Sequence, residues 1–144
     1  MSYWNRRTIV VRPEPEPETP ASLYDRITEA APFSELAWAL AYSLGKFSEK
    51  PQALLFAKRL ATDPEPAIRH AGVIALVHLH LDGFREAEHA LWTMLGDPDV
   101  RVRARLGKDL QWDDLPESAR LKQALAKDPV AAVRLKATTG LSVF

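Results

Sequence analysis

The 144-residue sequence is 47% hydrophobic and 26% charged, and its 19 lysines and arginines are balanced by 19 aspartates and glutamates. This composition is typical of one globular domain with a buried core. A net charge of zero gives no general attraction to nucleic acid or to an anionic membrane, so neither is expected as a partner. The absence of cysteine excludes disulfides, thiolate metal sites and a cysteine nucleophile.

Residues 1–20 are predicted to form an extended N-terminal tail. Positions 13–20 read Pro-Glu-Pro-Glu-Pro-Glu-Thr-Pro, which favours a polyproline conformation. The preceding aromatic, basic and β-branched residues allow two interpretations: a disordered terminus, or a segment that docks on another surface. We find no signal-peptide core and no run approaching the ~20 apolar residues of a membrane span. A cytoplasmic protein is therefore expected.

Residues 21–144 contain four copies of one spacing, each marked by a residue pair that ends in proline. The pairs recur at steps of 32, 34 and 31 residues, with a leucine thirteen positions after the first residue of each pair. The pairs are Ala31-Pro32, Asp63-Pro64, Asp97-Pro98 and Asp128-Pro129, and the leucines are Leu44, Leu76, Leu110 and Leu141. This period and the apolar spacing predict stacked helical hairpins in one repeat domain.

Eight helices in four pairs are predicted, with the proline at the turn inside each pair. The expected ranges are 21–30 and 33–46, 50–62 and 65–81, 84–96 and 99–112, and 116–127 and 130–142. The residues five, nine and thirteen positions after the first residue of each proline pair share one face of the second helix and should be core. They are Leu36, Leu40 and Leu44; Ile68, Gly72 and Leu76; Val102, Leu106 and Leu110; and Val133, Ala137 and Leu141.

A second column predicts ion pairs between or within the units. Six positions after the first residue of the proline pair stands an arginine in the three units whose pair begins with aspartate. In the unit whose pair begins with Ala31, this position is alanine. The residues are Asp63 with Arg69, Asp97 with Arg103, and Asp128 with Arg134. We expect each arginine to reach the aspartate of its own or the preceding unit. The first unit, which lacks both groups, is then a terminal cap.

The segments that begin at Asp63, Asp97 and Asp128 resemble HEAT repeats, most closely the short HEAT-like repeats of phycobilin lyases. The resemblance covers residues 50–144 by motif and 21–49 by register alone. It implies an all-α fold, a right-handed α-solenoid of about four hairpins whose second helices line the concave face. It implies little about chemistry, because such arrays include scaffolds, adaptors, inhibitors and a few enzymes.

Catalytic chemistry is not expected. Arg69-His70-Ala71 is similar to the Arg-His-Glu run of HEAT-like di-iron hydroxylases but lacks its glutamate. His78 and His80 point about 200° apart on one helix and cannot share a metal. No acid-base group suited to phycobilin attachment accompanies the repeats. We therefore predict a protein without enzymatic activity, metal or cofactor.

One outward stripe of charged and aromatic residues is the candidate binding site. In the third unit it consists of Arg101, Arg105, Lys108 and Trp112. Neighbouring units add further residues: Lys136, Thr139, Tyr42, Trp38, Ile74 and His78. The resulting groove should be aromatic at one end and cationic at the other. It favours an acidic, amphipathic segment of a partner protein.

Other interpretations of this stripe stay open. Its arginines could form a solvated helix face, with Trp112 packed beneath the next unit. HEAT-like DNA glycosylases pair basic and aromatic residues with a catalytic aspartate, and Asp109, Asp113 and Asp114 lie near Trp112. A non-catalytic protein-protein interaction module, such as a scaffold, adaptor or immunity-type inhibitor, is the predicted function. A nucleic-acid-binding protein or enzyme is the alternative, and the oligomeric state is open.

Overall fold

The computed structural model describes residues 17–111 and 115–139, with the side chain of Thr139 left out. Eight α-helices and one short 3-10 helix make up this part of the chain, and it contains no strand. They are α2 (Pro20–Glu29), α3 (Glu35–Gly45), α4 (Lys50–Ala61), α5 (Pro66–Leu81), η1 (Arg85–Ala87), α6 (Glu88–Met94), α7 (Val100–Leu110), α8 (Pro116–Leu125) and α9 (Ala131–Thr139). The all-α prediction is confirmed for these residues, with helix ends shifted by a few positions. The predicted Leu141 and the predicted tail before Pro17 lie outside them.

The helices begin where local sequence signals place them. Thr19 caps α2 and exchanges hydrogen bonds with Ser22, which satisfies free amides at the start of the helix. Ser34 caps α3 by accepting the amide hydrogen of Ala37 at 3.1 Å. Proline occupies the first turn of α2, α4, α5 and α8, where its missing amide costs no helical hydrogen bond.

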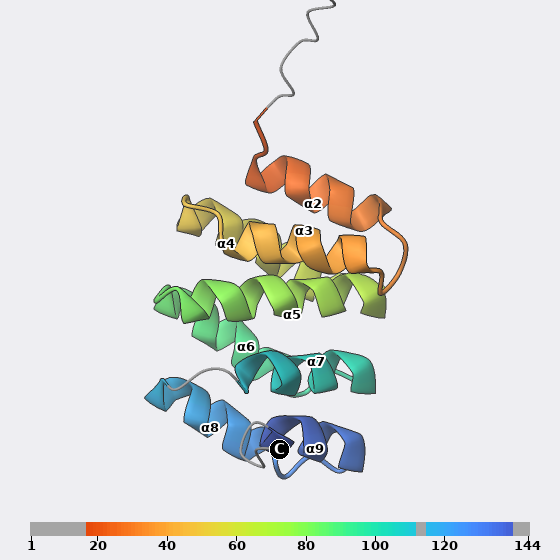
Figure 1. Ribbon diagram of the computed structural model, residues 1–144, viewed down its shortest axis with the longest axis vertical. Helices are drawn as coiled ribbons and strands as arrows, with labels where there is room; N and C mark the ends of the chain where they lie inside the picture. The colour runs from red at the N-terminus through yellow and green to blue at the C-terminus, as the bar shows by residue number, and fades with distance from the viewer. Residues whose placement is uncertain (1–16, 112–114, 140–144) are drawn as a thin grey trace, which may run out of the picture.

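The helices pack in two rows. One row contains α3, α5, α7 and α9, in which each helix contacts the next. The other row contains α2, α4, α6 and α8, and Figure 1 shows the pairs stacked from α2 at one end to α8 and α9 at the other. This arrangement is compatible with a helical repeat. We call the exposed side of the first row the second-helix face.

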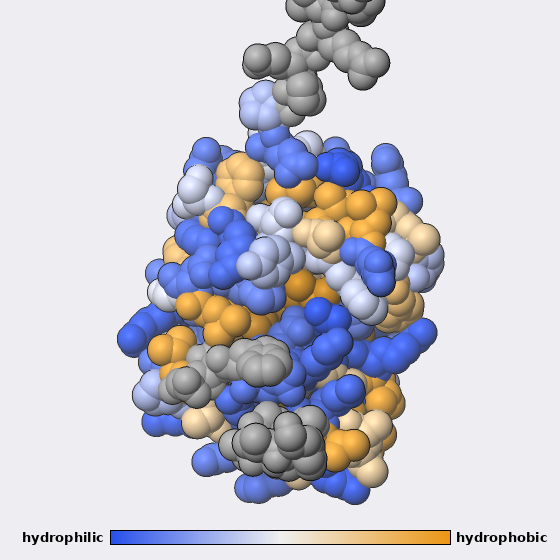
Figure 2. Space-filling model, viewed as in Figure 1, coloured by the Kyte–Doolittle hydropathy of each residue, from blue (hydrophilic) through white to orange (hydrophobic). Residues whose placement is uncertain are grey.

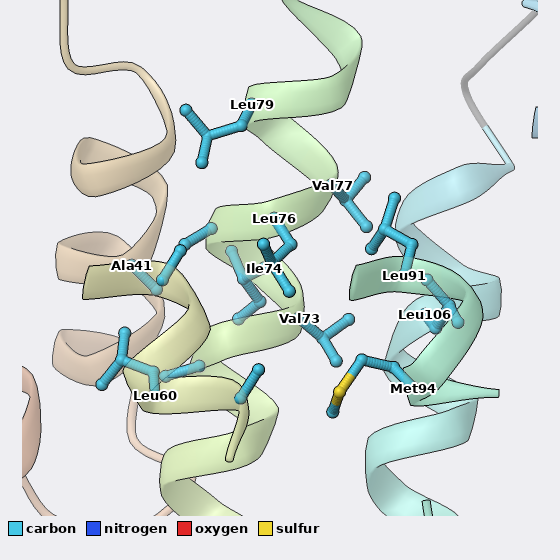
Figure 3. Close-up of a cluster of buried hydrophobic side chains, with 14 of the residues drawn as sticks. Ala41, Leu60, Val73, Ile74, Leu76, Val77, Leu79, Leu91, Met94 and Leu106 are labelled. Atoms are coloured by element: carbon cyan, nitrogen blue, oxygen red, sulfur yellow. The ribbon is translucent and has the colours of Figure 1, made fainter. Parts of the chain in front are cut away.

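Helix α5 contributes more buried residues than any other described helix, with ten of its residues buried. Figure 3 shows Ile74 and Leu76 on α5 among side chains from the helices on both sides. A β-carbon at Gly72 would lie 2.6 Å from the main-chain nitrogen of Ala61, so glycine permits the close contact of α4 with α5. The prediction of burial is confirmed for Leu76 and Leu110, both 0% exposed. The assignment of Ile74 to the groove is wrong, because α5 has neighbours on both sides and Ile74 is 1% exposed.

The first helical pair departs from the predicted core. Leu36 is 55% exposed, whereas Val102 and Val133 in the same column are fully buried. The prediction of a buried Leu36 is therefore wrong. No helical pair precedes α2 and α3 in the described ranges, so nothing there covers this side of α3.

Two arginines tie neighbouring helical pairs together. Arg69 Nε lies 2.8 Å from Asp97 Oδ2, and its Nη2 lies 3.2 Å from Asp97 Oδ1. Arg103 holds Asp128 in the same two-pronged way, at 2.7 and 3.3 Å. These four side chains are at most 13% exposed. Loss of either arginine would leave a buried carboxylate without its charge partner.

The predicted direction of this ladder is wrong for the carboxylates. Arg69 and Arg103 each pair with the aspartate of the following unit rather than with that of their own or the preceding one. The aspartate of its own unit contributes its main-chain carbonyl, 3.0 Å from Arg69 Nη1 for Asp63 and 2.6 Å from Arg103 Nη1 for Asp97. Arg69 and Arg103 therefore bridge two successive turns, which a pairing inside one unit would not do.

The two ends of the ladder are incomplete. The carboxylate of Asp63 accepts the amide hydrogen of Glu65 at 2.9 Å but contacts no arginine side chain in the described part of the chain. The position that should supply this arginine is Ala37. At the other end, Arg134 donates to the main-chain oxygen of Asp128 at 2.7 Å. It has no ion-pair partner among residues 17–111 and 115–139.

Candidate functional site

Helix α7 carries most of the candidate site. Its N-cap Asp99 accepts the amide hydrogen of Arg101 at 2.8 Å. Burial of Val102, Leu106 and Leu110 on one side of the helix turns its charged residues toward the second-helix face. This is a direct consequence of the apolar spacing that identified the repeat.

The predicted cations of α7 and α9 come together around one hollow. Arg101, Arg105, Lys108 and Lys136 line an open space of about 250 Å³, with Trp38 and His70 on its other sides. We call this the basic hollow. Figure 2 shows hydrophilic residues over α7, next to hydrophobic residues over α3 and α5. The sequence prediction placed five of these six residues in one groove and missed His70.

The cations lie against aromatic rings rather than apart from them. The guanidinium carbon of Arg101 lies 4.1 Å from the ring centre of Phe33, and that of Arg105 lies 5.1 Å from the Trp38 ring. Lys108 Nζ lies 6.0 Å from the Trp38 ring. Such cation–π contacts are favourable and restrict the side chains. The structure thus interleaves the charges and rings that the sequence analysis assigned to separate ends.

Phe33 is a site residue that the sequence analysis missed. It lies in the turn between α2 and α3 with φ of 55°, in the left-handed region that bulky residues rarely adopt. Its ring and that of His70 form a T-shaped pair with a centroid distance of 5.1 Å. Backbone strain of this kind costs about 1–3 kcal/mol and is often found at functional sites. No local sequence signal marks the conformation.

His70 is the buried residue between the rings. It is 7% exposed, lies 6.0 Å from Trp38, and its Nδ1 has no hydrogen-bond partner in the described structure. Burial and the nearby guanidinium groups of Arg105 and Arg101 lower its pKa to about 4. The imidazole is therefore neutral at pH 7 and adds no charge to the hollow.

Arg105 is less accessible than its predicted position suggested. Its Nε lies 2.9 Å from Asp109 Oδ1, and the two side chains are only 15% and 7% exposed. Burial raises the pKa of Asp109, although Arg105 opposes this shift. A glutamate at position 105 would face the buried Asp109 carboxylate, so we expect charge reversal there to destabilise the fold.

Internal ion pairs reduce the charge of the basic hollow. Arg101 Nη2 lies 2.9 Å from Asp99 Oδ2, and Arg105 pairs with Asp109. Lys108 and Lys136 are exposed and have no carboxylate partner in the part of the chain that the structure covers. Four cations against two carboxylates leave a surplus of two positive charges, carried by these lysines.

The remaining predicted residues lie elsewhere. Tyr42 is 48% exposed, and its ring lies 4.6 Å from His78 and 5.6 Å from Lys46 Nζ. A β-carbon at Gly45 would lie 2.7 Å from that of His78, so the close contact of α3 and α5 brings these rings together. Neither Tyr42 nor His78 lines the basic hollow. Trp112 falls outside the described residues.

Comparison with known proteins gives no family for this chain. No protein-family model matches the sequence, and no curated protein matches it significantly. Among the residues described, no group of three or more histidine, aspartate or glutamate side chains is placed to bind a metal. The helices within those ranges are too short or too polar to cross a membrane.

Proposed function

We propose that this protein is a non-catalytic binding module whose second-helix face holds an acidic segment of a partner protein. We also propose that its helical pairs form a right-handed α-solenoid of about four HEAT-like hairpins, with this face concave. A cytoplasmic scaffold, adaptor or immunity-type inhibitor would use such a surface. The partner is defined by its chemistry, an acidic and amphipathic helix or extended peptide.

The basic hollow is the observation that carries this proposal. Stacking on Phe33 and Trp38 holds the guanidinium groups of Arg101 and Arg105 in place before any ligand arrives. Such ordering reduces the entropy that binding would otherwise cost. Arginine and tryptophan are also the residues most often found at the energetic centres of protein interfaces.

The size and charge of the hollow favour a peptide over other ligands. Its volume of about 250 Å³ lies below the ~300–1,000 Å³ typical of sites for small molecules and cofactors. It suits one or two side chains of a larger partner. A surplus of two positive charges also falls short of the six or more phosphate contacts that commonly hold a protein on DNA.

The two lysines without carboxylate partners provide the sharpest test. Partners recovered from the native host by the full chain would be purified, and their affinities measured calorimetrically for the wild type and the Lys108→Glu, Lys136→Glu double variant. We expect the double variant to bind at least ~30-fold more weakly, about 2 kcal/mol, because both exposed cations become repulsive. Equal affinity would exclude the basic hollow as the binding site.

A matched variant controls for net charge. Arg120→Glu with Lys127→Glu changes the charge of the chain by the same amount, at exposed positions on α8 and in the turn after it. This variant should bind the partner like the wild type. Salt dependence separates the alternatives: a slope near two released counterions supports the peptide, and a slope of about six or more supports nucleic acid.

A further inference from the structure

The junction between the first two helical pairs lacks the arginine found at the two junctions after it. Ala37 occupies the position of Arg69 and Arg103. An open hollow of about 230 Å³ adjoins Ala37, and its walls include Phe33, Ile68 and Glu65. By register, an arginine at position 37 would extend beside this hollow toward Asp63, which stands two residues before Glu65 of its wall. We call the hollow and the carboxylate of Asp63 the vacant rung.

The carboxylate of the vacant rung is oriented like its two paired counterparts. In each of the three turns, the aspartate Oδ1 accepts the amide hydrogen of the residue two positions later, at 2.9 Å. Asp97 and Asp128 then receive the Nε and Nη2 groups of an arginine. Asp63 has the same turn contact and no cation within ion-pair distance in the described residues. The acceptor half of the rung is present without its donor.

The vacancy does not follow from being at the end of the stack. The ladder arginines reach forward to the next unit, and a first unit has a next unit to reach. No helical pair precedes α2 in the described residues, so an aspartate in place of Ala31 would have no ladder arginine there to receive. The same reason does not account for Ala37, because Asp63 stands in the following turn.

We infer that the vacant rung is a binding site for the arginine side chain of a partner. A guanidinium group can donate two parallel hydrogen bonds to Asp63, as Arg69 and Arg103 do to their own partners. Glu65 adds a second carboxylate to the wall of the hollow, and Phe33 and Ile68 offer apolar surface to the stem. The compact ammonium group of lysine lacks this planar fork.

The vacant rung adjoins the basic hollow through Phe33 but is a separate site. Phe33 forms a wall of the vacant rung, and the guanidinium carbon of Arg101 in the basic hollow lies 4.1 Å from the centre of its ring. A partner that engages both sites would present an arginine close to an acidic group. The two sites share Phe33, but they use different charged residues and are tested with different variants.

The test uses a ligand and its neutral analogue on the full chain. N-acetyl-arginine amide and N-acetyl-citrulline amide have nearly the same shape, but only the first carries a guanidinium charge. Both would be titrated into 15N-labelled protein while the amide signals of Phe33, Ala37, Asp63 and Glu65 are followed by NMR. We expect saturable shifts at these amides with a Kd of about 1–10 mM for the arginine compound. The citrulline compound should bind at least ten-fold more weakly.

Three substitutions test the vacant rung, so that the result does not depend on the folding of a single variant. Asp63→Asn keeps an oxygen for the turn contact but removes the charge, and should weaken the arginine compound at least ten-fold. Ala37→Arg should supply the missing donor, abolish the shifts and raise Tm by about 3–6 °C. Ala37→Met fills the hollow without a charge and should not raise Tm by this amount.

Several outcomes would overturn the inference. Equal shifts from the arginine and citrulline compounds would show that charge plays no part. Unchanged affinity in Asp63→Asn would remove its carboxylate from the site. If Ala37→Arg were no more stable than Ala37→Met, position 37 would not be a missing rung. None of these measurements depends on the basic hollow, so failure here leaves the proposed function untouched.

Discussion

The first and third helical pairs share one sequence register but differ at the positions that face their neighbours. In the third pair, Val102 is fully buried and Arg103 holds Asp128 at 2.7 Å. In the first pair, Leu36 is 55% exposed and Ala37 adjoins a hollow of about 230 Å³. Residues that face the inside of a helical pair form its core. Residues that face outward are buried or paired only where another helical pair supplies the contact.

The two departures of the first pair have different causes. Leu36 is exposed because no described helix packs on that side of α3, which is a consequence of position in the stack. Ala37 is followed by a turn whose aspartate, Asp63, has no ion-pair partner in the described residues, so its departure has no such explanation. The place of the first pair in the stack accounts for the exposure of Leu36. For Ala37 we propose a binding role instead.

The largest expected effect comes from the buried positions that all pairs share. Leu110→Ala should lower the free energy of unfolding by about 2–5 kcal/mol, because Leu110 is fully buried and the substitution leaves a cavity. Leu36→Ala, the same substitution at an exposed position of the repeat, should change it by no more than about 0.5 kcal/mol. Urea unfolding of both variants measures the difference. Equal losses would show that burial does not separate the two pairs.

A second effect concerns His70, which joins the first pair to the third. Its pKa is lowered to about 4 in the folded protein, chiefly by burial, and is about 6.5 in an unfolded chain. The unfolded chain therefore binds the proton more readily between these values, so stability falls as pH decreases from about 6.5 to about 4. The loss from this group should be on the order of 3 kcal/mol at most.

Urea unfolding between pH 7 and pH 4 measures this loss. His70→Phe keeps a ring against Phe33 and Trp38 and does not titrate, so it should lose less stability than the wild type over the same range. The other titrating groups are the same in both proteins. Parallel curves would mean that His70 is not the group responsible.

Local signals in the sequence predicted the helices and most of the core. The α5 range expected at 65–81 is found at Pro66–Leu81, because proline fixes the start and apolar spacing defines the buried side. Leu76 and Leu110 were placed correctly for the same reason. Leu36 was not, because its burial depends on a neighbouring pair rather than on its own helix.

The candidate site was predicted less completely, because it depends on contacts between helices far apart in sequence. The outward positions of Arg101, Lys108 and Lys136 follow from helix geometry. Their meeting with Phe33 and His70 does not, since it requires the way that α3, α5 and α7 pack. The pair of Arg105 with Asp109 had a usable signal, four residues of spacing on one helix, which supports an ion pair.

The ladder direction also lay beyond the sequence. A repeating aspartate and arginine show that the two groups belong together, but the same spacing allows a pair within one unit or across either junction. The distances resolve this: Arg69 and Arg103 each reach the carboxylate of the following unit. Because the pairs run forward, Ala37 is the position from which an arginine would reach Asp63. A substitution at a junction that has its arginine therefore tests the comparison with the vacant rung.

Removal of the arginine from one junction of the ladder should have the smallest of the three effects on stability. Arg103→Ala is expected to lower the free energy of unfolding by about 1–3 kcal/mol, because Asp128, 6% exposed, would keep its charge without the guanidinium. Arg134→Ala is the matched control: it removes an arginine of the same column that donates to a main-chain oxygen and pairs with no carboxylate in the described structure. Its loss should be clearly smaller in urea unfolding at pH 7. If the two losses were equal, the carboxylate of the next unit would not be what stabilises a rung, and the free carboxylate of Asp63 would lose its significance as a site.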